Sequence, residues 1–195
     1  MIRLFRLAFD PAYRSLKLAD PSLLDTPALQ FDSTSRAATW TPIDLVLADD
    51  QGSSKPEPDF WQIQGLPPVF AYSASIADDP AIEWACCEQL PIHFGNRPFI
   101  LGNATEQRCY DALDVAHCEW PSGIPGVGVP SKYAFYRSSN GLPRVGGPTI
   151  FTVPETCALE LYVYEYDCDP DEEFKAKIED GGLTGLVFEE IWYEK

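Results

Sequence analysis

The chain has 195 residues with 30 Asp or Glu and 14 Lys or Arg, which gives a formal net charge of −16 at pH 7. A surface of one sign repels DNA, RNA and anionic lipid, so it argues against those partners and favours a cationic one. A hydrophobic content of 45% is typical of a globular chain rather than a disordered acidic tail. Acidity also serves plain solubility, and that interpretation stays open beside the first.

The chain shows no sequence feature of a membrane or secreted protein. No apolar run reaches about 18 residues, and residues 1–14 interleave basic and apolar side chains instead of forming a signal-peptide core. We therefore expect a cytoplasmic protein. Its six cysteines are then expected to be reduced thiols, most of them buried: Cys86, Cys87, Cys109, Cys118, Cys157 and Cys168.

The first third of the chain predicts few regular elements. Residues 2–9 are dense in aliphatic and aromatic side chains and predict a strand, whereas prolines interrupt the stretch that follows. Within it, 41–48 is a strand candidate and 49–59 is a solvated loop. We predict an irregular N-terminal lobe over 1–65, with one or two strands, and an α+β domain over 66–195, the two forming one compact unit.

Regular patterns begin with an apolar strand at 69–72. A helix is predicted over 78–90, because Asp78 or Asp79 can accept N-cap hydrogen bonds and Pro80 suits the first turn. Its buried face would consist of four residues at helical spacing: Ile82, Ala85, Cys86 and Leu90.

A hairpin and a further strand are predicted next. Residues 91–94 and 97–101 form two short strand candidates, with Asn96 and Asn103 at turn positions. Residues 109–120 are strand-like, with two acids in the middle.

The segments after residue 120 alternate between loop and strand. Residues 121–130 are rich in Gly and Pro and predict a structural loop, because they lack the lysine of a phosphate-binding loop. Strands are predicted at 132–137, 148–154 and 159–167, the last with a clear period of two.

The C-terminal segment predicts a helix and a strand. The helix covers 170–180, with Pro170 as its first residue and the Gly181-Gly182 pair as its stop, and the strand covers 183–192. The predicted fold class is α+β, a mainly antiparallel sheet of short strands with two or three packed helices.

Histidine and cysteine cluster in one part of the chain. His93 and His117 fall in the same stretch as Cys86, Cys87, Cys109 and Cys118. Zinc accepts such ligands, but structural sites present them as CxxC or HxxxH pairs, whereas here several are adjacent and would face opposite sides of a strand. We expect no metal and no cofactor, and a Cys/His metal-binding scaffold stays as an alternative.

Enzyme motifs do not occur in the sequence. It has no GxSxG, HExxH, Rossmann or phosphate-loop pattern. Cys109 with His117 is a conceivable nucleophile–base pair, and Asp111 with Asp114 a conceivable acid–base pair. Two acids three residues apart on a strand face opposite sides, so a turn or cap role is favoured. We expect no enzyme, with a small uncharacterised enzyme as an alternative.

Several segments form a recognisable order along the chain. They are PDFWQI (58–63), VFAYSASI (69–76), EQLPIHF (88–94), ALDV (112–115), PTIFTV (148–153) and EEFKAKIEDGGLTGLVFEEIW (172–192). Together they resemble the immunity proteins of bacterial polymorphic toxin systems, of the immunity-eleven type. The resemblance spans roughly 58–192, and its most specific part is the terminal helix with GLTGLVFEEIW.

The resemblance implies a non-enzymatic protein that binds a toxin inside the cell that produces it and blocks that toxin. It carries over no catalytic residue. Gly182, Leu183, Gly185 and Phe188 match the closing motif, and we expect them to serve the fold, the glycines in backbone turns and Phe188 in the core.

Charge and resemblance together predict an immunity protein that occludes the active site of a cationic toxin. From Glu155 to Lys195 there are 13 acids and only three lysines. Such a face would speed capture of a cationic partner, and aromatic neighbours would add affinity. A homodimer is an alternative assembly. The predicted toxin-binding residues are Asp167, Asp169, Asp171, Glu172 and Glu173, with Tyr164 and Tyr166, and a second set formed by Asp49 and Asp50.

Overall fold

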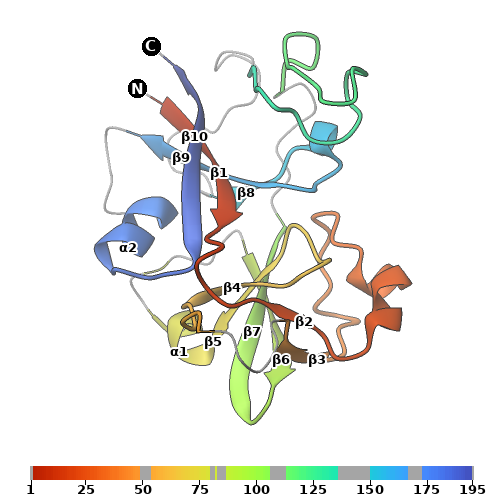
Figure 1. Ribbon diagram of the computed structural model, residues 1–195, viewed down its shortest axis with the longest axis vertical. Helices are drawn as coiled ribbons and strands as arrows, with labels where there is room; N and C mark the ends of the chain where they lie inside the picture. The colour runs from red at the N-terminus through yellow and green to blue at the C-terminus, as the bar shows by residue number, and fades with distance from the viewer. Residues whose placement is uncertain are drawn as a thin grey trace.

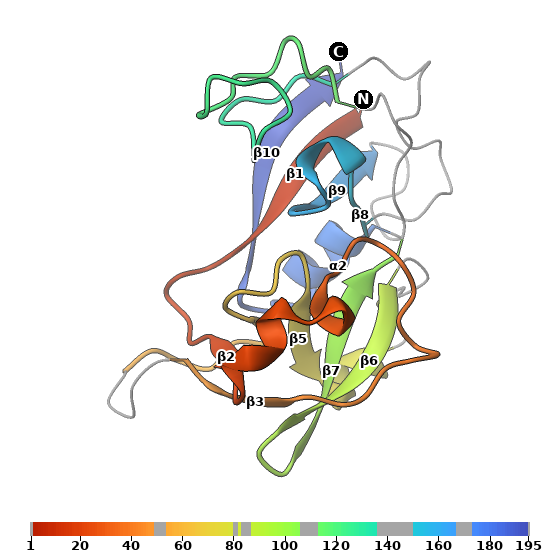
Figure 2. The ribbon, with the colours of Figure 1, turned by 90° about the vertical axis from the view of Figure 1, so that its right-hand side faces the viewer.

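The strands form two sheets (Figures 1 and 2). The computed structural model describes residues 2–48, 54–79, 82, 87–105, 113–135, 150–166 and 173–194. A four-stranded sheet has the order β10-β1-β9-β8, and a six-stranded sheet the order β2-β3-β6-β7-β5-β4. Of the described neighbouring strands, only β3 and β6 are parallel. The predicted α+β class with a mainly antiparallel arrangement is therefore confirmed, but the strands form two sheets instead of one, and the described chain has less helix than predicted.

The elements have the following bounds. The four-stranded sheet contains β1 (Ile2–Phe9), β8 (Ile150–Phe151), β9 (Leu161–Tyr166) and β10 (Leu186–Glu194). The six-stranded sheet contains β2 (Leu16–Leu18), β3 (Asp44–Leu47), β4 (Phe60–Gln62), β5 (Phe70–Ser73), β6 (Cys87–Phe94) and β7 (Arg97–Ala104). The helices are α1 (Ala74–Ala77) and α2 (Phe174–Asp180), with 3-10 turns η1 (Pro21–Asp25), η2 (Pro27–Leu29) and η4 (Pro154–Thr156). The described α-helices are short, and neither could cross a membrane.

The N-terminal strand lies inside the four-stranded sheet. β1 pairs with β10 on one side and with β9 on the other, both antiparallel. This confirms the predicted strand at 2–9. Both segments 1–65 and 66–195 supply strands to each sheet, so the predicted boundary separates strands that are hydrogen-bonded to one another.

Both faces of the four-stranded sheet are covered. On one face Phe5 and Leu7 pack with Phe174 and Ile178 of α2. On the other face Leu4 packs in a cluster with the segment 113–135 and with the tyrosines of β9. Alternate residues of β1 thus enter two different cores, as the period of a strand dictates. A sheet covered on both faces gives strands that are apolar at nearly every position.

The six-stranded sheet is built around the β6–β7 hairpin. Residues 95–96 make its turn, with Gly95 at φ +59. Trp61, Phe94 and Phe99 meet in edge-on contacts with ring centroids 5.3 to 6.2 Å apart. The predicted turn at Asn96 is correct. Asn103 is not a turn residue: it is fully buried inside β7.

The predicted helix over 78–90 is wrong where the structure describes it. Residues 87–90 belong to β6, and α1 lies earlier, at 74–77. The spacing of Leu90 from earlier apolar residues fits a helix, but residues 87–94 also alternate between buried and exposed, which is the period of a strand. Pro91 is tolerated because its backbone faces away from β7, where its carbonyl accepts from the Trp40 indole at 2.8 Å. Residues 80–81 and 83–86 lie outside the described part.

The middle of the chain is less regular than predicted. In 113–120, residues 115–117 form a turn and only Leu113 and Glu119 make isolated bridges, to Phe135 and Lys132. The strands predicted at 109–120 and 132–137 are therefore absent from the described residues 113–135. The loop predicted at 121–130 is confirmed.

The closing motif joins the two sheets. The Phe60 N–H of β4 donates to the carbonyl of Thr184 at 3.0 Å, and the Thr184 N–H donates to the Asp59 carboxylate at 2.8 Å. Gly185, at φ +98, lies so close to β4 that a Cβ there would be 2.1 Å from the Phe60 carbonyl oxygen. The Gly185 position therefore admits only glycine.

The terminal helix ends as predicted. α2 begins at Phe174, and residues 170–172 of the predicted helix lie outside the described part. Gly181 and Gly182 end it, with Gly182 at φ +62. Phe188 is partly buried against the α2-side core, as its expected fold role requires.

Candidate functional site

The predicted toxin-binding residues are only partly described. Asp49, Asp50, Asp167, Asp169, Asp171 and Glu172, together with the side chain of Tyr166, lie outside the described residues. Tyr164 is 2% exposed and stacks obliquely on Phe151, and Glu173 is 4% exposed at the start of α2. Since both side chains are buried in the free chain, they cannot offer a contact surface without a rearrangement.

Most cations of the described part are held by the chain's own carboxylates. The ion pairs are Arg3–Glu165, Arg6–Glu189, Arg6–Glu160, Arg36–Asp32, Arg97–Glu57, Lys132–Glu119, Lys175–Glu165 and Lys175–Glu179. By contrast, five exposed acids have no cationic partner among the described residues: Asp20, Asp25, Asp78, Asp180 and Glu190. The charge left for an external partner is therefore negative.

One carboxylate in the four-stranded sheet is fully engaged, and we call its surroundings the Glu160 network. Glu160 has a side chain 8% exposed and accepts from the Tyr133 hydroxyl at 2.8 Å, the Tyr162 hydroxyl at 2.6 Å and Arg6 at 3.2 Å. Burial raises the pKa of Tyr133, and the bond to Glu160 raises it further. The pKa of Tyr162 is raised by burial and by the charge of Glu160. Both phenols thus stay protonated donors, and the carboxylate is occupied rather than poised as a base.

A second carboxylate acts in the same way in the six-stranded sheet. Glu88 accepts from the Ser35 hydroxyl at 2.6 Å, from the N–H groups of Arg36 and Ala37 at 2.8 Å, and from the Asn103 amide at 3.1 Å. Burial raises the pKa of Glu88, but these hydrogen bonds outweigh it and lower the pKa overall. This Glu88 network ties the segment before β3 to β6, and it too leaves no oxygen for chemistry.

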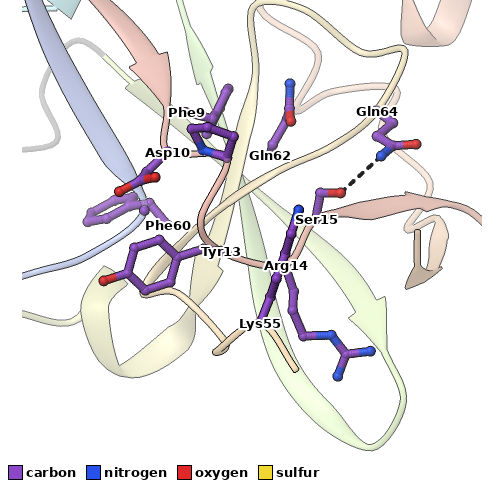
Figure 3. A pocket seen from close by; sticks show the side chains of 11 residues that line it. Phe9, Asp10, Tyr13, Arg14, Ser15, Lys55, Phe60, Gln62 and Gln64 are labelled. Carbon is purple, nitrogen blue, oxygen red and sulfur yellow. Dashed lines mark hydrogen bonds between the residues drawn. The ribbon is translucent and has the colours of Figure 1, made fainter. Parts of the chain in front are cut away.

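A small polar pocket opens where the chain passes from β1 to β2 (Figure 3). Its volume is about 140 Å³, and its lining includes Asp10, Tyr13, Arg14, Lys55 and Gln64. Ligand pockets for drug-sized molecules have volumes of roughly 300–1,000 Å³, so this one suits water or a small ion. This pocket therefore offers no room for an organic substrate, whereas a more open hollow beside Trp61 and Arg97 has a volume of about 360 Å³.

The described histidines and cysteines do not assemble a metal centre. The Nδ1 atoms of His93 and His117 lie 3.0 Å from Asp44 and 2.8 Å from Asp114, each in a separate pair. Cys87 packs in the α2-side core and Cys118 in the opposite core. No three candidate ligands gather anywhere in the described ranges. Cys86 and Cys109 lie outside those ranges.

The conceivable enzyme pairs receive no support from the described residues. Cys109 and Asp111 lie outside the described part. Asp114 sits at a turn, where its carbonyl accepts from the N–H groups of His117 and Cys118 at 3.0 and 3.1 Å. A turn role was the favoured interpretation of Asp114. As expected, Cys87 and Cys118 are buried thiols, whereas Cys157 is an exposed thiol.

Sequence reasoning did not single out Glu88, Glu160 or Arg6. The partners of Glu88 lie some fifty positions away along the chain, at Ser35 to Ala37, so no local pattern reveals them. For Glu160 one signal was present, because Tyr162 is two residues on and must share its strand face.

Comparison with known proteins adds no relative. No model of a known protein family matches the chain, and no curated protein is significantly similar to it. The likeness of segments 58–192 to the immunity-eleven type therefore stays a prediction.

Proposed function

We propose that this chain is an immunity-type protein, which binds a cationic toxin in the cytoplasm of the producing cell and occludes its active site. The observation that supports this proposal is that exposed acids without an ion-pair partner outnumber such cations in the described part of the chain. Six of the ten described Lys and Arg residues are held by internal ion pairs, and Lys17 is exposed without one, whereas five acids are exposed without a cation among the described residues: Asp20, Asp25, Asp78, Asp180 and Glu190. Such a surface favours a basic protein over nucleic acid or membrane.

The mechanism is steric and electrostatic. A cleft that accepts an anionic substrate is lined by cations, so an acidic protein is complementary to its rim and is drawn to it at an enhanced rate. The engaged state of Glu88 and Glu160 also favours binding over catalysis, since all of their oxygens already accept hydrogen bonds. We infer that the chain blocks its target without a chemical step.

The test is a titration against the toxic domain encoded by the adjacent reading frame. We expect a 1:1 complex at or below micromolar concentration, loss of toxin activity in the complex, and weaker binding as salt is raised from 0.05 to about 0.5 M, because salt screens exposed charge. Absence of a complex at micromolar concentration would refute the proposal.

A neutralised variant provides the matched control. Asp25→Asn, Asp78→Asn, Asp180→Asn and Glu190→Gln together remove four charges that make no described ion pair, so folding should be retained. The variant should bind the same toxic domain more slowly and with a smaller dependence on salt. An unchanged rate of association would show that these carboxylates do not steer the partner.

A further inference from the structure

β10 is the outermost strand of the four-stranded sheet. Eight of its nine residues pair with β1, with a register shift at Ile191, and no other described strand pairs with it. Figure 2 shows β10 at one side of the sheet, followed by β1, β9 and β8. Long edges of this kind present unpaired backbone groups and are ready templates for another strand.

The register shows which backbone groups face outward. The Asp10 N–H donates to the carbonyl of Gly185 at 3.1 Å, so the next hydrogen-bonded positions of β10 are two and four residues further on. The N–H and carbonyl groups of Leu186, Phe188 and Glu190 therefore point away from β1. None of these six groups has a backbone partner among the described residues.

The charge of β10 discriminates between possible occupants of its outer edge. Its sequence, LVFEEIWYE, has three glutamates and no Lys or Arg. Arg6 binds Glu189, whereas Glu190 is exposed and has no cation among the described residues. Two copies of the chain joined edge to edge would bring like charges together, which is unfavourable, whereas a strand with Lys or Arg would gain cross-strand pairs.

We propose that the outer edge of β10, defined by the backbone of Leu186, Phe188 and Glu190, receives an extended segment of the cationic partner as a fifth strand. This inference rests on the proposed function and assigns it a binding surface. Main-chain hydrogen bonds supply affinity in such strand addition, while side chains on alternate positions supply selectivity. Val187, 37% exposed, and Glu190 flank the incoming strand.

Amide hydrogen exchange tests the surface directly in the unaltered chain. In the free protein the outward amides of Leu186, Phe188 and Glu190 should exchange faster than the inward amides of Val187 and Glu189, which bond β1. On saturation with the toxic domain from the adjacent reading frame, the outward amides should slow by about tenfold or more. A complex in which their exchange is unchanged would overturn the inference and leave the proposed function standing.

A proline variant tests the same edge by affinity. Glu190→Pro removes one outward N–H and adds a ring on the edge while sparing the ladder to β1, and Glu190→Gln removes only the charge. We expect Glu190→Pro to weaken binding by at least about tenfold and Glu190→Gln by less than about fivefold. Equal affinity of the proline and glutamine variants would overturn strand addition.

The remaining outcomes are also decisive. If the wild-type chain does not bind the toxic domain, the proposed function and this inference both fail. If the outward amides are protected in the free protein and that protection rises with protein concentration, the occupant is a second copy of this chain and the cationic-partner inference is wrong. If Glu190→Pro does not fold, the exchange experiment on the wild-type chain still decides.

Discussion

Each sheet has one glutamate that fastens a long irregular segment to it, and the two sites use different donors. In the four-stranded sheet, Glu160 holds the segment 113–135 through Tyr133, with a cation and a second phenol beside it. In the six-stranded sheet, Glu88 holds the segment before β3 through two backbone N–H groups, a hydroxyl and an amide.

The two networks show how carboxylates can fix irregular segments in a chain that is rich in proline and acidic residues. Neither segment is fixed by extensive strand pairing, so carboxylates with several donors replace the missing ladder hydrogen bonds. The Glu160 carboxylate is largely removed from water, with a side chain 8% exposed, and binds the partly exposed Arg6, whereas Glu88 is closer to solvent and has neutral donors only. Disruption should therefore cost more at Glu160 than at Glu88.

The largest effect is expected at the joint on which both sheets depend. Gly185→Ala would place a Cβ 2.1 Å from the Phe60 carbonyl oxygen, at a residue with a left-handed φ. Backbone strain and overpacking together should lower the free energy of unfolding by about 4 kcal/mol. Urea denaturation of the two proteins measures it. Gly123→Ala is the matched control, because its φ is also positive, +71, but its Cβ would meet nothing within 4 Å. Equal losses of stability at both positions would show that Gly185 does not lie this close to the Phe60 carbonyl of β4.

The next effect distinguishes the two glutamate networks. Glu160→Gln leaves two phenols and Arg6 competing for one neutral acceptor and should cost about 3 kcal/mol, whereas Glu88→Gln should cost about 1.5 kcal/mol. Denaturant titrations at pH 7 give both values. An order reversed between the two variants would contradict the comparison.

The smallest expected effect is a change in how the free energy of unfolding falls at acidic pH. Because the folded pKa of Glu88 lies below its unfolded value of 4.5, its hydrogen bonds contribute stability above that pH, and the contribution is lost as pH falls through the folded pKa. Glu88→Gln should therefore show a shallower loss of stability below about pH 4.5 than the wild-type chain. The variant should still lose some stability in acid, because Asp32 keeps its contribution. The pKa of Asp32 is lowered mainly by the hydrogen bond from the Thr34 hydroxyl. If the free energy of unfolding falls with the same slope in both proteins as pH is lowered, Glu88 does not contribute to the loss of stability in acid.

Strong local patterns allowed the four-stranded sheet to be predicted. The strands at 2–9 and 159–167, the glycine stop after α2 and the closing strand each follow from a short stretch of sequence. The pairing of β1 with β9 and β10 does not, because strand adjacency depends on contacts between the two ends of the chain.

The six-stranded sheet was harder to predict for two reasons. β2 and β4 contain only three residues each, too few for a period to show among prolines, whereas β3 lies within the strand predicted at 41–48. Residues 87–90 fit both a helical and a strand spacing, and the hairpin with β7 decides in favour of the strand. The outer edge of β10 was equally out of reach, since an edge is a property of the assembled sheet.

The place of β1 between β9 and β10 sets an order of events on the ribosome. All strands of the six-stranded sheet have been synthesised once Ala104 is made, so that sheet can assemble early. β1 is synthesised before the other described strands, yet its two neighbours, β9 and β10, are the last two described strands to be made. Until then the apolar strand β1 has neither of its pairing strands in the nascent chain, so it can aggregate or bind chaperones. Protection of β1 is thus deferred until β9 and β10 have been made.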